Sequence, residues 1–362
     1  MLTDAIVSTP AELERDLLDA RARALRVTSD LDGERLLGPK LAIVNPPLWE
    51  IGHVAWFQER WCLRLRADGS LADSILPGAD ALYDSAAVAH DTRWSLPLLD
   101  LKATRAYGEQ VLGCVRGRLE REPESEALQY FVRLATFHED MHAEAFHYTR
   151  QTLGYGEPFP ALGFSPSEGE EVEFEGGAFL LGASPSNSFV FDNEKWAHEV
   201  HVAPFRISAS PVSNAQFLAF VEAGGAVPRY WKKQDGGWLQ RRFDRWLPLA
   251  PDEPVRHVSW NEAQAYCAWA KRRLPTEAEW ECASAKLAYG RVWEWTESAF
   301  QPYPGFVIDP YKEYSEPWFG THKVLRGGSF ATPERLMRPT FRNFYTPERG
   351  DVFCGFRTCV LG

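Results

Sequence analysis

The spacing of apolar side chains predicts a helical first half. Apolar residues recur every three or four positions, which places them on one face of an α-helix. The pattern gives four helices, over about residues 10–28, 48–66, 99–119 and 125–153. Thr9-Pro10-Ala11-Glu12 is a capping box with proline at the first helical position, so it marks the start of the first helix. Four amphipathic helices predict a bundle, in which residues 67–98 form a long connection.

The pattern changes after Gly154. Glycine and aromatic residues become frequent, and short β-like runs replace the helical spacing. Strands are predicted over Glu171–Phe174, Ala178–Gly182 and His201–Phe205, and short helices over Asn214–Ala223 and Trp260–Arg273. The chain is therefore predicted to be α+β. A helical domain is expected over residues 1–160 and a loop-rich domain over 161–362, with the boundary near 155–168.

Composition narrows the classes of function. A chain of 362 residues exceeds one average domain, and a hydrophobic content of 45% supplies material for two cores. The net charge of −11 argues against nucleic acid as a partner. There is no apolar leader at the start and no uncharged run of the roughly 18–20 residues that a membrane span needs, so neither a signal peptide nor a membrane partner is expected.

The six cysteines are scattered along the chain rather than arranged as a disulfide framework. Reduced thiols are therefore expected, and with them a cytoplasmic location. Cys354 and Cys359 are near enough in sequence to pair or to share a metal, but structural or incidental thiols are the favoured interpretation.

His138 and His142 are the clearest candidates for chemistry. They stand four residues apart on a predicted helix, so both rings lie on one face and can hold a single ion. His53, on the second predicted helix, is the candidate third ligand, because bundles build metal sites from facing helices. A lone histidine among apolar neighbours is more often a core residue. Three neutral imidazoles on one side of a redox metal would leave the other side open for substrate and O₂.

Two further interpretations remain open. His138-Glu139-Asp140-Met141-His142 matches the H-E-x-x-H motif of zinc peptidases, in which the glutamate activates water. The extended form of that motif is absent, because its glycine and third histidine are replaced by Ala145 and Tyr148. The interpretation that assigns no chemistry is a helical bundle whose histidines are structural.

A set of motifs runs through the second half, from about residue 170 to 360. It includes Pro254-Val255-Arg256-His257-Val258-Ser259-Trp260, Arg273-Leu274-Pro275-Thr276-Glu277, Val292-Trp293-Glu294-Trp295-Thr296, Arg326-Gly327-Gly328-Ser329-Phe330 and Gly355-Phe356-Arg357. Together these motifs resemble the sulfatase-modifying-factor (formylglycine-generating-enzyme-like) domain, which has a C-type-lectin-like fold. The first half resembles a DinB-like four-helix bundle.

The fusion of these two domains resembles the ergothioneine-pathway sulfoxide synthases and their relative selenoneine synthase. This resemblance implies a non-heme Fe(II) ion held by His53, His138 and His142. It implies hercynine, the trimethylated betaine of histidine, as a substrate that is used together with O₂. It also implies that Arg342-Asn343-Phe344 contacts the trimethylammonium group. A tyrosine near the iron acts as catalytic proton donor in these enzymes, and Tyr303 is the candidate here.

Three departures from the sulfoxide synthases bear on the second substrate. Tyr345 replaces an aspartate that binds the amino group of the thiol donor in those enzymes. The stretch that binds the donor's carboxylates in those enzymes has a single arginine here, Arg93, followed by Trp94. Met141 replaces a glutamine. Fewer ionic contacts indicate a less charged donor, such as a selenosugar stacking on Trp94, Trp49 or Tyr345. The resemblance is therefore closest to selenoneine synthase, with a sulfoxide synthase that uses a thiol donor as the alternative.

Overall fold

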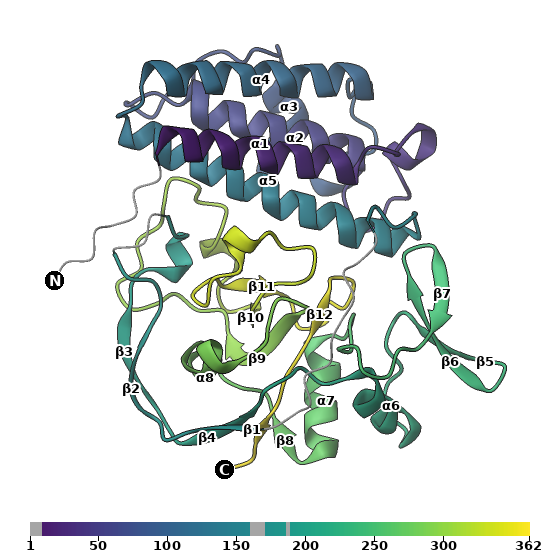
Figure 1. Cartoon of the computed structure of the whole chain (residues 1–362). Helices are drawn as coiled ribbons and strands as arrows, with labels where there is room; N and C mark the ends of the chain where they lie inside the picture. Colours follow the sequence, from purple (N-terminus) through teal and green to yellow (C-terminus); the bar gives the residue numbers. More distant parts are fainter. Residues whose placement is uncertain (1–8, 160–170, 186–188) are drawn as a thin grey trace. The chain divides into compact units, whose positions relative to one another are not determined.

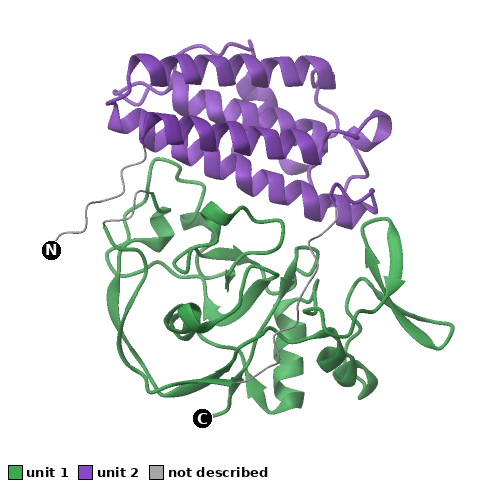
Figure 2. Cartoon of the chain, in the orientation of Figure 1, with its two compact units in different colours: residues 1–5, 160–362 green, residues 6–159 purple. Residues whose placement is uncertain are grey.

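The computed structural model describes residues 9–159, 171–185 and 189–362. These residues form two compact units, one that ends at Phe159 and one that contains the described residues from Glu171 onward (Figure 2). The predicted boundary near 155–168 falls partly outside the described residues. We describe each unit by itself.

The N-terminal unit is a four-helix bundle, as predicted (Figure 1). Its long helices are α1 (Pro10–Val27), α2 (Pro47–Glu59), α4 (Leu101–Arg121) and α5 (Glu126–Leu153). Helix α1 packs along α5, and α2 packs against both α4 and α5. The Thr9 side chain and the Glu12 carboxylate form the predicted capping box, and Gly154 ends α5 at a φ of 69°.

The second helix was predicted to run as a single α-helix to residue 66, and the structure differs from this prediction. Helix α2 ends at Glu59 and continues as a π-helical turn, Arg60–Arg64. The connection over residues 67–98 is also more ordered than expected, because it contains the short helix α3 (Ala79–Tyr83) and a 3₁₀ turn, His90–Thr92.

Polar contacts fasten this connection to α2. The indole nitrogen of Trp49 donates to the carbonyl of Leu82 at 2.7 Å, and that of Trp56 donates to the Asp80 carboxylate at 2.6 Å. Gly52 lets the two segments approach, since a Cβ at that position would lie 2.2 Å from the ring of Tyr83. The connection is therefore a fixed part of the helical unit rather than a loose loop.

The C-terminal unit has two four-stranded sheets, in the orders β1-β4-β13-β8 and β11-β10-β9-β12. The first comprises β1 (Glu171–Phe174), β4 (Phe205–Ser208), β13 (Cys359–Val360) and β8 (Arg272–Arg273). The second comprises β11 (Asn343–Tyr345), β10 (Lys323–Arg326), β9 (Trp293–Ala299) and β12 (Cys354–Gly355).

Smaller elements complete this unit. The strands β2 (Gly177–Leu181) and β3 (His198–Val202) form a pair, and β5 (Trp231–Gln234), β6 (Gly237–Arg242) and β7 (Arg245–Pro248) form a three-stranded sheet. The helices are α6 (Asn214–Glu222), α7 (Trp260–Ala270) and α8 (Glu277–Ala283). The α+β prediction is thus confirmed, whereas β5 to β7 and α8 were not predicted.

One predicted strand was wrong in its bounds. The run His201–Phe205 is not one strand, because β3 ends at Val202 and β4 begins at Phe205. Pro204 lies between them and has no N–H to donate to a ladder, which explains the break.

The two neighbouring cysteines are structural. Cys359 packs in an apolar cluster with Val202, Phe205 and Ile207. Cys354 is fully buried, and its thiol donates to the carbonyl of Val258 at 3.0 Å. Both thiols are free, so the pairing considered above does not occur.

Among the helices that the structure describes, none has both the length and the apolar character that crossing a bilayer takes.

His257 makes the stability of the C-terminal unit sensitive to acid. It is buried against Tyr230 and Phe353, and burial, followed by the charge of Arg256, lowers its pKa to about 3. Between pH 6.5 and 3 the unfolded chain binds a proton here that the folded chain does not, so folding weakens as the pH falls, by roughly 1.4 kcal/mol per pH unit.

We expect His257→Asn to remove this dependence, because asparagine tolerates the φ of 62° at this position and does not titrate. Urea unfolding of the full chain at pH 7, 6, 5 and 4 tests this. Wild type should lose stability relative to His257→Asn at each step below pH 6. Parallel curves for the two proteins would contradict the assignment.

Candidate metal centre

Three histidines meet inside the helical unit. His53 comes from α2, and His138 and His142 come from α5. One nitrogen from each ring lies within 4.8 Å of the others. His53 and His138 are each 3% exposed, and His142 is half-buried. The i, i+4 spacing on α5 places two rings on one face, and the packing of α2 against α5 brings the third.

Hydrogen bonds select which nitrogen of two rings faces the centre. Nδ1 of His53 lies 2.8 Å from the carbonyl oxygen of Tyr83, which only accepts, so Nδ1 carries the hydrogen. Nδ1 of His142 lies 2.5 Å from a carboxylate oxygen of Glu50. Both arrangements leave Nε2 with its lone pair available, as metal-binding histidines usually do.

Aromatic rings fix two of the histidines in place. Trp49 stacks on His53 with ring centroids 4.8 Å apart and planes 9° from parallel. Phe57 stacks on His138 with centroids 3.6 Å apart and planes 4° from parallel. These apolar walls hold the rings and limit access of water from the α2 side.

Burial keeps two of the imidazoles neutral. Desolvation, followed by the nearby charge of His142, lowers the pKa of His53 and of His138 well below the usual 6.5. Neutral imidazole is the form that binds a metal ion. The centre therefore offers nitrogen donors at neutral pH without first losing protons from these two rings.

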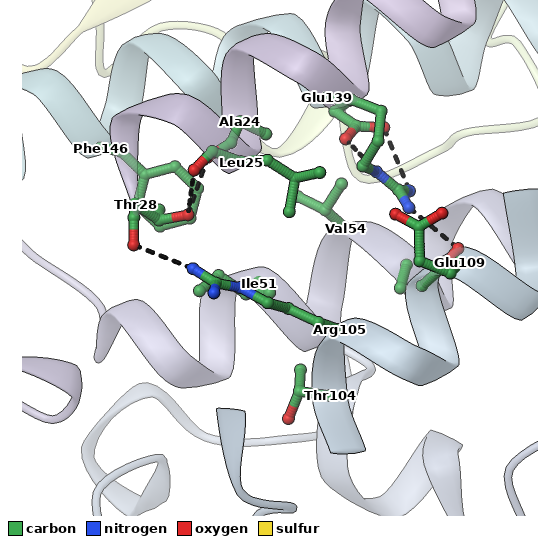
Figure 3. A pocket seen from close by; sticks show the side chains of 13 residues that line it. Ala24, Leu25, Thr28, Ile51, Val54, Thr104, Arg105, Glu109, Glu139 and Phe146 are labelled. Atoms are coloured by element: carbon green, nitrogen blue, oxygen red, sulfur yellow. Dashed lines mark hydrogen bonds and ion pairs between the residues drawn. The ribbon is translucent and has the colours of Figure 1, made fainter. Parts of the chain in front are cut away.

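Glu139 does not point at this centre. Its carboxylate accepts a hydrogen bond from Nε of Arg21 at 2.6 Å, and Arg21 also donates to the carbonyl of Gly108 at 2.9 Å. Figure 3 shows Glu139 at the edge of a pocket lined mainly by apolar side chains of the bundle, including Leu25 and Val54. The peptidase interpretation needs this carboxylate as a base near the metal, so the structure disfavours it.

Comparison with known proteins identifies the family. Residues 16–146 match the DinB superfamily, and residues 163–289 and 286–360 match the sulfatase-modifying factor enzyme 1-like domain. The chain is 33% identical to the hercynine oxygenase of Mycolicibacterium thermoresistibile, over 98% of this chain and 96% of that protein. The chain belongs to the hercynine oxygenase family.

Other members and partial relatives agree with this assignment. The hercynine oxygenase of Mycobacterium tuberculosis is 31% identical over 97% of this chain and 99% of its own length. The formylglycine-generating enzyme of Streptomyces coelicolor is 33% identical and covers 56% of this chain. The predicted two-domain resemblance is thus confirmed, whereas the closer resemblance to selenoneine synthase stays a prediction.

Arg93 and Trp94, predicted to contact the donor, are engaged within the helical unit. Arg93 is 8% exposed, lies 3.9 Å above the ring of Trp49, and donates to the side chain of Asn45 at 2.7 Å. The indole nitrogen of Trp94 donates to the carbonyl of Gly38 at 3.1 Å. These contacts favour a structural role for Arg93, while Trp94 is half-buried.

Met141 lies on α5 immediately before His142 and is half-buried. An adjacent helical position points about 100° away around the axis, so the two side chains leave α5 in different directions. A contact between Met141 and substrate stays a prediction.

The other predicted site residues belong to the C-terminal unit. Arg342 is 1% exposed and donates two hydrogen bonds to the Glu277 carboxylate, at 2.9 and 3.0 Å. Two further hydrogen bonds from its guanidinium reach the carbonyls of Asn193 and Gln301. Arg342 therefore cross-links the core of this unit, and a direct contact with substrate stays a prediction.

Tyr303 joins the same buried network. Its hydroxyl donates to the Glu277 carboxylate at 3.2 Å and accepts from Arg326 at 3.1 Å. Burial raises the pKa of this phenol, and Glu277 raises it further. The hydroxyl therefore stays protonated at neutral pH, as a proton donor must, although its catalytic role stays a prediction.

The neighbours of Arg342 in sequence are more accessible. Asn343, Phe344 and Tyr345 form β11, and all three are half-buried. Phe344 stacks on Phe300 at 4.1 Å, and Arg349 lies 5.0 Å over the ring of Tyr345. Phe344 is thus held as a fixed aromatic surface, which suits a cationic ligand.

Sequence reasoning missed two partners of the histidines. Glu50 holds His142, and the carbonyl of Tyr83 holds His53. One signal was available, because Glu50 precedes His53 by three positions and so lies on the same face of α2. No local pattern marks Tyr83, since a backbone carbonyl carries no side-chain signature.

Proposed function

We propose that this chain is an Fe(II)- and O₂-dependent enzyme that acts on hercynine and forms a carbon–selenium bond at C2 of its imidazole ring, with a selenosugar as donor. The group of His53, His138 and His142 carries the proposal. The broader statement, an oxygenase acting on hercynine, is supported by the full-length similarity to hercynine oxygenases. The more specific statement, that the donor is a selenosugar, rests on the residues predicted to bind the donor.

The donor set fits the proposed metal. Imidazole nitrogen binds Fe, Zn and Cu, and the relation to oxygenases favours iron among these. When bound, Fe(II) supplies the one-electron chemistry that allows O₂ to react with organic substrates. Three protein ligands on one side leave positions for other molecules.

The protein holds the ligand rings in position and shields them from water. Trp49 and Phe57 keep the rings of His53 and His138 oriented and shielded. Replacing the C2–H bond of hercynine with a C2–Se bond to a selenol donor releases two protons and two electrons, which together reduce one O₂ to hydrogen peroxide. Tyr303 is our candidate for a proton donor, and Phe344 for the surface that receives the trimethylammonium group.

The donor-site residues support a donor with little charge. Arg93, the single arginine of the stretch that resembles a carboxylate-binding site, is committed to Asn45, to backbone carbonyls and to Trp49. Tyr345 offers an aromatic ring where the thiol-using enzymes have an aspartate. A sugar that stacks on aromatic rings suits these residues better than an amino-acid thiol with carboxylates.

Product analysis tests the proposal. The Fe(II)-loaded chain is mixed with hercynine and O₂, and with either a selenosugar or γ-glutamylcysteine, and the products are identified by mass. We expect a hercynine–selenium adduct with the selenosugar, at a rate at least tenfold above that with the thiol. Product from the thiol alone would contradict the selenium assignment and leave the broader oxygenase assignment standing. No consumption of hercynine with any donor would contradict the whole proposal.

A further inference from the structure

Glu50 is an acidic side chain buried beside the three histidines. Its side chain is 1% exposed, and its carboxylate accepts a hydrogen bond from Nδ1 of His142 at 2.5 Å. Glu50 lies in the first turn of α2 and His142 lies on α5, so this bond joins the two helices that supply the centre. Such a contact fixes both the tautomer and the direction of the ring.

A buried carboxylate needs compensation for lost hydration. Arg93 provides positive charge nearby: burial lowers the pKa of Arg93, and the Glu50 carboxylate acts in the opposite direction. Arg93 stacks on Trp49, and Trp49 stacks on His53. Glu50 therefore contacts one histidine directly, and Trp49, which Arg93 contacts, stacks against a second.

We propose that Glu50 is a positioning residue of the metal centre, which orients His142 so that its Nε2 faces the ion. This inference rests on the proposed function, because it assumes that the three histidines bind a metal. The stack of Arg93 on Trp49, which in turn stacks on His53, favours a role for Arg93 in supporting the centre rather than in binding the donor.

Cobalt binding tests this role without relying on turnover. Co(II) binds to the same type of ligands, and its visible absorption reports their geometry. In Glu50→Ala the ring of His142 loses its partner, and we expect Co(II) affinity to fall by roughly 10–100-fold, with an altered absorption spectrum. Glu50→Gln keeps an oxygen that accepts from Nδ1, so it should recover most of the affinity and a spectrum close to that of wild type.

Glu59→Gln is the matched control. Glu59 is also buried on α2, but its carboxylate binds the hydroxyl of Tyr107 and the backbone N–H of Ile75 rather than a histidine. We expect this variant to bind Co(II) with the wild-type spectrum. Circular dichroism and thermal melting of each metal-free variant show whether it is folded.

Several results would overturn the proposal. One is a folded Glu50→Ala with wild-type affinity and spectrum. Another is a spectrum in Glu59→Gln that changes as much as in Glu50→Ala, because any buried carboxylate of α2 would then matter equally. Equal loss in Glu50→Gln and Glu50→Ala would exclude the hydrogen bond as the cause. A wild-type chain that binds no Co(II) would remove the centre itself, whereas bound metal without hercynine turnover would count only against the proposed function.

Discussion

Replacing His142 with alanine removes metal binding, whereas replacing His147 with alanine does not. His142 supplies one of three nitrogens that lie within 4.8 Å of one another. Loss of a partner residue of a metal ligand usually costs 10–100-fold in affinity, so loss of the ligand itself should cost more than roughly 100-fold. We expect the same result for His53→Ala and His138→Ala. Iron content after anaerobic loading and desalting measures the effect, with about one iron per chain in wild type.

His147 is a demanding control for this experiment. It lies five positions further along α5, is 8% exposed, and its Nδ1 is bonded to the carbonyl of Ala143 at 2.8 Å. His147→Ala therefore removes a more deeply buried histidine from the same helix, one that is not part of the three-histidine group. Retained iron in His142→Ala would contradict the proposed ligand set. Equal loss of iron in both variants would show that α5 had been disrupted.

The second large effect is expected for Glu277→Gln. Glu277 accepts hydrogen bonds from Arg326, Arg342 and Tyr303 in the core of the C-terminal unit. Burial acts to raise the pKa of Glu277, but Arg342 and Arg326 outweigh it and the pKa is lowered. Removing this charge leaves two buried guanidinium groups short of a partner, which typically costs about 3–5 kcal/mol of stability.

Urea unfolding of the full chain measures this loss. Glu199→Gln, at an exposed position of β3, is the control and should change the free energy of unfolding by less than about 0.5 kcal/mol. If Glu277→Gln were as stable as Glu199→Gln, then Arg342 and Arg326 would not depend on this carboxylate. Arg342 would then be available for the substrate contact predicted from the sequence.

The helices were predictable because their signals are local. Apolar spacing located the four helices of the bundle, and the Thr9–Glu12 capping box marked the start of α1. The i, i+4 spacing of His138 and His142 likewise required only one helix to be correct. The sequence signal for His53 as a metal ligand was weaker on its own, and the family resemblance was needed to select it from the other histidines.

Partners from distant parts of the chain were not predictable. Arg342 meets Glu277 across 65 positions, and His142 meets Glu50 across 92. Such pairs are determined by how distant segments pack, and the spacing of apolar residues along the sequence does not predict them. Arg93 illustrates the consequence, because its sequence context indicated a donor contact while its buried position and its stack on Trp49 indicate support for the centre.

The most direct test of the central claim is O₂ uptake coupled to loss of hercynine. The Fe(II)-loaded chain and the His142→Ala variant are compared in an oxygen electrode, with hercynine followed by mass spectrometry and the selenosugar present. We predict that wild type consumes hercynine and O₂ together and that His142→Ala consumes neither above the rate without protein. Hercynine consumed equally without O₂, or equally by His142→Ala, would contradict an iron-dependent oxygenase built on these three histidines.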